Sequence, residues 1–239
     1  MTTRIRPEQI RNLDSGGGVS ALGLAQIPSG LIHFTTAGVP LGSGLFGGFY
    51  TSSGSRGMNN YYGLYCQIKP ATGSGTMADI RSTKTMSYIH APILVVKFNF
   101  INTTSSYECS IGLHPAFYGG LNAGNYPQIG LYVNRSLSNG QVNFRTRDVY
   151  GQENTLTSYT LRHSTDPYYL IIEYKSTTEV KFSLYDKDMT LLTDATHTTH
   201  ILAEDLAMGF LMENKSSTTD PGFKLWYIKA LHSIAWKNI

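Results

Sequence analysis

The run YYLIIEY at residues 168–174, the turn KSTT at 175–178 and the run EVKFSLY at 179–185 decide the fold of this chain. Both runs are rich in the aromatic and β-branched residues typical of strands, and the four residues between them are polar. Two such runs joined by a short polar turn predict an antiparallel β-hairpin.

The second run alternates between apolar and polar side chains. Val180, Phe182 and Leu184 fall on one face of a strand, and Lys181 and Ser183 fall on the other. A period of two is typical of a strand that packs one face against a core. The hairpin therefore predicts a sheet that is covered on at least one side.

Similar runs recur along the chain, with turn signals such as Ser138-Asn139-Gly140 between them. Many short strands at close spacing predict an all-β antiparallel sandwich. We also expect one short helical turn within 198–206. The expected strands are Tyr61–Ile68, Met86–Ile101, Ser106–Leu113, Gln128–Val133, Gln141–Arg147, Thr155–Leu161, Tyr168–Lys175, Val180–Tyr185, Thr190–Thr193, Ala207–Glu213 and Phe223–Trp236.

Composition narrows the function classes. The chain has 239 residues, which suits one large β-sandwich, and only 15% of them are charged. The net charge is +3, and the densest basic sets, Arg4/Arg6/Arg11 and Arg145/Arg147, are too small for a nucleic-acid footprint. No apolar run is long enough to span a membrane, and the N-terminus lacks the apolar core of a signal peptide.

The N-terminal quarter differs from the rest. Residues 1–18 carry the apolar side chains Ile5, Ile10 and Leu13 before a triple glycine, which predicts either an anchor peptide followed by a hinge or a frayed tail. Residues 19–57 are rich in glycine, which predicts an extended arm that needs neighbours to stay ordered. The sandwich domain is expected to cover residues 58–239. Because fibres share such arms around a rotational axis, we expect a homotrimer.

Three stretches resemble the concanavalin-like (laminin-G-like) jelly roll. They are the hairpin Tyr168–Tyr185, the strand Met208–Asn214 with the loop that follows it, and the closing strand Phe223–Leu231. The resemblance implies that Pro92–Phe100 is a long early strand paired with the closing one. It extends over about residues 86–236.

The segment RPEQIRNLDSG at residues 6–16 resembles the anchor peptides of tailed-phage virion proteins. This resemblance implies a non-enzymatic virion structural protein, such as a head fibre, decoration or tail protein. It would be made in the host cytoplasm and would attach to other virion proteins through Ile5, Ile10 and Leu13. A carbohydrate-binding lectin-like module is the alternative, and a polysaccharide hydrolase or lyase is the less favoured one.

No catalytic, metal or cofactor site is predicted. Retaining hydrolases of this fold use two carboxylates from one strand, spaced so that both face one cleft. The chain lacks that pattern, because Asp186 and Asp188 are expected in a turn. His197 and His200 are expected on opposite faces of a strand, which does not favour a shared metal. Cys66 and Cys109 are either buried thiols or one disulfide.

The loop 114–127 carries the best binding signal. Its exposed rings and amides resemble those of sugar platforms and of protein interfaces, and its glycines allow tight shapes. We expect it to bind a host-surface glycan or to pack against a neighbouring subunit. The candidate binding residues are Phe117, Tyr118, Asn122, Asn125 and Tyr126.

Overall fold

The computed structural model describes most of the chain from residue 65 onward and short strands before it. The described residues are 30–33, 41–42, 49–50, 56–57, 61–62, 65–70, 73–82, 87–100, 106–115, 128–134, 141–161, 166–216 and 222–232.

These residues form strands and one short 3-10 helix, η2 (Tyr88–His90). The strands are β1 (Gly30–His33), β2 (Leu41–Gly42), β3 (Phe49–Tyr50), β4 (Arg56–Gly57), β5 (Tyr61–Tyr62), β6 (Tyr65–Pro70), β7 (Met77–Ser82), β8 (Pro92–Phe100), β9 (Tyr107–Pro115), β10 (Gln128–Asn134), β11 (Gln141–Arg147), β12 (Glu153–Thr160), β13 (Tyr168–Ser176), β14 (Glu179–Tyr185), β15 (Leu191–His197), β16 (Leu206–Asn214) and β17 (Phe223–His232).

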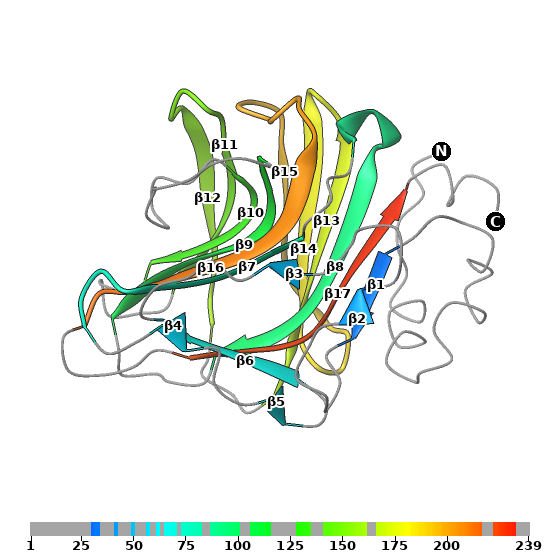
Figure 1. The fold of residues 1–239 in the computed structure, drawn as a ribbon. Coiled ribbons are helices and arrows are strands. Elements are labelled where there is room, and N and C mark those ends of the chain that lie inside the picture. Colours follow the sequence, from blue (N-terminus) through cyan, green and yellow to red (C-terminus); the bar gives the residue numbers. More distant parts are fainter. Residues whose placement is uncertain are drawn as a thin grey trace.

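Two antiparallel sheets form the two layers of a sandwich (Figure 1). The ten-stranded sheet runs β15-β14-β13-β8-β17-β1-β2, with β6 pairing β17, β4 and β5. The seven-stranded sheet runs β12-β11-β10-β9-β16-β7-β3. In Figure 1 the seven-stranded sheet is curved, and its outer side is the concave one.

The predicted pairings are confirmed. Strands β13 and β14 form the expected hairpin, with Leu170 opposite Leu184 and Tyr174 opposite Val180. The long early strand β8 pairs with the closing strand β17, in a register that places Phe223 opposite Phe100. The antiparallel, concanavalin-like sandwich is therefore the observed fold.

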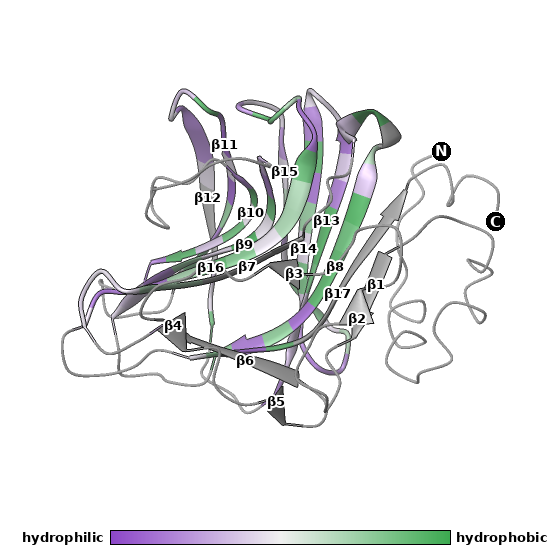
Figure 2. Ribbon diagram, viewed as in Figure 1, coloured by the Kyte–Doolittle hydropathy of each residue, from purple (hydrophilic) through white to green (hydrophobic). Residues whose placement is uncertain are grey.

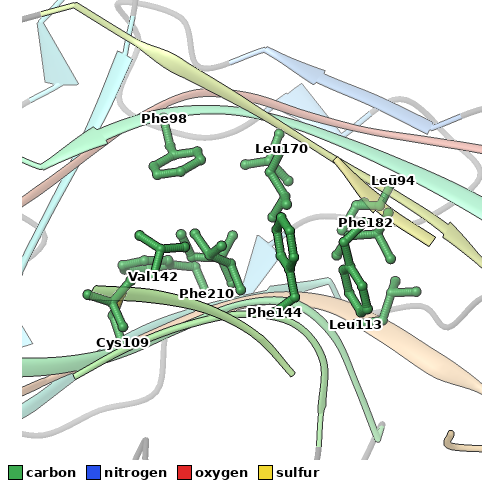
Figure 3. Close-up of a cluster of buried hydrophobic side chains, with 14 of the residues drawn as sticks. Leu94, Phe98, Cys109, Leu113, Val142, Phe144, Leu170, Phe182 and Phe210 are labelled. Atoms are coloured by element: carbon green, nitrogen blue, oxygen red, sulfur yellow. The ribbon is translucent and has the colours of Figure 1, made fainter. Parts of the chain in front are cut away.

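The core lies between the sheets, where rings from both layers meet (Figure 3). Phe144 on β11 stacks on Phe182 on β14, with centroids 5.1 Å apart. Phe210 on β16 stacks on Phe223 on β17 at 3.9 Å. These cross-layer stacks bury large apolar surface, which is the main force that holds the two sheets together.

Hydrophilic residues interrupt the hydrophobic ones along the strands of both sheets (Figure 2). On β14 the expected alternation is present, since Val180, Phe182 and Leu184 belong to the core cluster and Lys181 does not. On the seven-stranded sheet, the same period of two therefore shows which side chains point away from the core.

The structure departs from the expectations in several places. The strand expected from Met86 begins only at Pro92, because Tyr88–His90 form the 3-10 helix η2. The strand β7 was not predicted, because MADIRS contains residues with low strand propensity, and its pairing with β16 supplies what the local sequence lacks. The prediction of a short helical turn in 198–206 was wrong. His200 has a left-handed φ of 54°, which a right-handed helix excludes.

The described parts of the glycine-rich arm pair with the sandwich of the same chain. β1 pairs with β17 at one sheet, and β3 pairs with β7 at the other. The anchor peptide 1–18 lies outside the described residues. Among the described residues, no helix has the length and apolar character needed to cross a membrane.

Candidate functional site

Polar side chains line the outer side of the seven-stranded sheet, where they are buried or half-buried, and we call this set the polar face. Its side chains alternate with core residues such as Ile111 and Leu131, so they point away from the core. Strands β9, β10, β11 and β16 supply them. The polar face consists of Glu108, Ser110, His114, Gln128, Tyr132, Asn134, Asn143, Arg145, Arg147 and Glu213.

A row of glycines crosses the middle of the polar face. Gly112 on β9 lies opposite Gly130 on β10 and Gly209 on β16. A Cβ at Gly130 would overlap the backbone of Ile111, so the close approach of β9 and β10 requires glycine there. Because this row has no side chains, Gln128 can lie flat across it and accept a hydrogen bond from Ser110.

One end of the polar face is acidic. Glu108 on β9 is paired with Glu213 on the neighbouring strand β16, and the side chain of Lys215 lies near both carboxylates. The Lys215 Nζ atom is 2.7 Å from Glu213 Oε1 and 3.4 Å from Glu108 Oε2. Burial alone lowers the pKa of Lys215, but the hydrogen bond to Glu213 and the charge of Glu108 outweigh it and raise the pKa.

Tyr132 connects this acidic end to the centre of the face. Asn134 Nδ2 donates to Glu108 Oε1 at 3.2 Å and to the Tyr132 hydroxyl at 3.3 Å. Burial and the nearby charge of Glu108 raise the pKa of Tyr132 to about 12, so its hydroxyl stays protonated at neutral pH. The network fixes a phenol ring and an amide in one arrangement.

The other end of the polar face carries two arginines. Arg145 and Arg147 are alternate residues of β11, and both contact Glu153 Oε2, at 2.9 and 2.6 Å. The Arg145 guanidinium also lies 4.4 Å from the centre of the Tyr132 ring, within cation–π range. Burial lowers the pKa of Arg145, and the charge of Glu153 opposes this effect.

The sequence-predicted loop residues lie outside the described residues, so their role stays a prediction. These are Phe117, Tyr118, Asn122, Asn125 and Tyr126. The structure does describe the two residues that bracket the undescribed part of the loop, Pro115 at the end of β9 and Gln128 at the start of β10. Both lie at the Arg147 end of the polar face, since Gln128 is opposite Arg147. The virion-anchor residues Ile5, Ile10 and Leu13 are also outside the described residues.

The carboxylates of the turn between β14 and β15 have structural roles. Asp186 Oδ1 accepts the backbone amides of Asp188 and Thr190, at 2.9 and 2.8 Å. The prediction that Asp186 and Asp188 are turn residues is confirmed. Among the described residues, no group of three or more histidine, cysteine or acidic side chains could hold a metal ion.

His197 and His200 have different partners. His200 Nδ1 lies 3.2 Å from Asp148 Oδ2, whereas His197 is buried and lies 3.1 Å from the Thr146 hydroxyl. The two imidazoles therefore share no metal site. Cys109 has a free, buried thiol, and burial raises its pKa.

Sequence reasoning missed the polar face, although the signal was present. In YECSIGLHP, Cys109, Ile111 and Leu113 alternate with polar or small residues, as in a half-buried strand. The spacing of carboxylates along one strand does not reveal a pair that comes from two different strands. Glu108 and Glu213 come together across strands that are far apart in sequence, which only pairing reveals.

The fold is that of a lectin-like sandwich. The legume lectin-like domain from Entamoeba histolytica matches with a TM-score of 0.59 and 14% identity, covering 77% of this chain and 89% of that one. The VIP36 exoplasmic/lumenal domain, solved in a Ca2+/Man3GlcNAc-bound form, matches with a TM-score of 0.54 and 10% identity over 80% and 92% of the two chains. Identities this low show the fold alone.

The chain belongs to the SO2946-like C-terminal domain family, whose profile matches residues 67–225. SO2946 from Shewanella oneidensis MR-1, described as a protein of unknown function, has a TM-score of 0.61 and 18% identity over 85% of each chain. No curated protein sequence matches this chain.

Proposed function

We propose that this protein is a non-enzymatic, lectin-like module that binds a glycan on the polar face. The observation that carries the proposal is the fixed network of Tyr132, Asn134 and Glu108, which presents a ring, an amide and a carboxylate together. Sugars need such mixtures, because their hydroxyls both donate and accept hydrogen bonds and their ring faces pack on aromatic groups. The sandwich is also shared with carbohydrate-recognition domains, including the one from Emp46p.

A glycan array with the full chain tests the proposal, followed by titration of the best ligand. Tyr132→Ala should weaken binding by about tenfold, since the ring and its hydrogen bonds are lost. Lys181→Gln is the matched control, because Lys181 pairs with Asp194 at 3.6 Å in the other sheet. If the array shows no binding by the full chain, the proposed function is wrong.

We further propose that this protein is part of a phage virion, and the sequence of residues 1–18 supports this proposal. Glycan binding suits such a place, since an adhesion protein must recognise a host surface. A chain that begins at residue 19 should stay folded and lose attachment to particles. Normal attachment of that shortened chain would show that Ile5, Ile10 and Leu13 do not anchor the protein.

A further inference from the structure

The turn between β11 and β12, residues 148–151, is held rigidly beside the polar face. Asp148 Oδ1 accepts the backbone amides of Tyr150 and Gln152, at 3.0 and 2.9 Å. The Asp148 backbone exchanges further bonds with Gln152 and Gly151. His200 lies 3.2 Å from the other carboxylate oxygen. The backbone of Tyr150 is therefore fixed before any ligand arrives.

Tyr150 is exposed on this rigid turn. Its relative exposure is 88%, whereas Tyr107, Tyr168 and Tyr174 are buried in the core. A single exposed apolar residue needs no special explanation on its own. When the backbone that carries an exposed ring is already fixed, the ring can bind a flat partner with little further loss of conformational entropy.

Unused hydrogen-bond donors lie next to the turn. The side chain of Arg147 passes under Gly151, where an added Cβ would be 3.2 Å from Arg147 Nη2. The Nε of Arg147 and the Nε2 of Gln128 are buried and have no acceptor in the structure. Gln128 is fully buried and lies opposite Arg147 in the pairing of β10 and β11. Leaving a buried donor without an acceptor is unfavourable, so a small side-chain shift that offers these donors to a ligand would be favoured.

The charges around the turn select the class of ligand. Arg145 and Arg147 are balanced by Glu153 and Asp148, so the formal charges sum to zero when His200 is neutral. Glu153 is 41% exposed and would repel a second carboxylate placed beside Arg147. A neutral ligand with hydroxyl groups suits this corner, because it can accept from Arg147 and donate to Glu153.

We propose that Tyr150 is an aromatic platform for a neutral pyranose ring, whose hydroxyls bond to Arg147 and Glu153. This site deepens the proposed function and rests on it. The apolar face of the sugar stacks on the phenol ring, while the polar rim of the turn fixes its orientation.

Calorimetric titration of the full chain with neutral oligosaccharides, such as mannotriose and lactose, tests the platform. Tyr150→Ala should weaken the binding of the better ligand by about tenfold, and Tyr150→Phe should keep it within about threefold, since the ring does the stacking. Ile89→Ala is the matched control, because Ile89 is another highly exposed apolar residue, at 74%, and lies on η2.

The outcomes separate the two proposals. Wild-type binding that Tyr150→Ala leaves unchanged overturns the platform but keeps the glycan-binding function. Tighter binding of oligogalacturonate than of the neutral sugars overturns the choice of a neutral ligand. No binding of any glycan by the wild type overturns both.

Discussion

His197 should make the protein sensitive to acid. The imidazole is buried at the end of β15, edge-on to the ring of Phe182 at 5.0 Å. The single hydroxyl hydrogen of Thr146 goes to the carbonyl oxygen of Thr199 at 2.9 Å, so the Nδ1–H of His197 donates to the Thr146 oxygen. Nε2 then has no partner in the structure, and protonating it would place a buried charge without an acceptor.

The size of the effect follows from the two pKa values. Burial lowers the pKa of His197 from 6.5 to about 4 in the folded chain. Between these values the unfolded chain binds more protons than the folded one, so the stability is fully present above pH 6.5 and falls as the pH drops toward 4. The total loss is about 3 kcal/mol, and about 2 kcal/mol of it is lost between pH 7 and pH 4.5.

Urea denaturation of the wild type and of His197→Gln at pH 7 and pH 4.5 measures this loss. The wild type should lose about 2 kcal/mol more than the variant over this interval, because glutamine does not titrate. His200→Gln is the control, since it removes a partly exposed histidine three residues away. Equal pH dependence in the wild type and in His197→Gln would refute the reasoning.

Three further predictions follow from the packing and the chemistry. Gly130→Ala should prevent close pairing of β9 and β10 and lower the melting temperature sharply, whereas Gly75→Ala, where a Cβ meets nothing within 4 Å, should cost only about 1 kcal/mol for its positive φ. Phe144→Ala should cost about 3–5 kcal/mol in urea denaturation, since it removes one ring of a cross-sheet stack; a cost below 1 kcal/mol would contradict the described core. Polysaccharides should not be hydrolysed, and reducing-sugar release that Glu108→Gln abolishes would show that the carboxylates of Glu108 and Glu213 are catalytic.

The local sequence was sufficient to predict strands wherever the alternation was strong. The hairpin of β13 and β14 was expected from β-branched and aromatic runs, and the pairing of β8 with β17 was expected from the resemblance to the concanavalin-like jelly roll. Both are present. β7 was missed because Ala78 and Asp79 have low strand propensity, so that strand depends on its neighbour β16.

By itself, the sequence determined an all-β sandwich, since a period of two fixes which side chains can be buried together. It also placed Asp186 in a turn, because an aspartate carboxylate bonds to nearby backbone amides. The tertiary structure decided the candidate site. Glu108 meets Glu213, and Arg147 meets Gln128, only through the order and register of strands, which no local pattern contains. The surface that we propose binds a glycan is therefore a product of pairing between distant segments, and the physical reason is that register sets which side chains on different strands become neighbours.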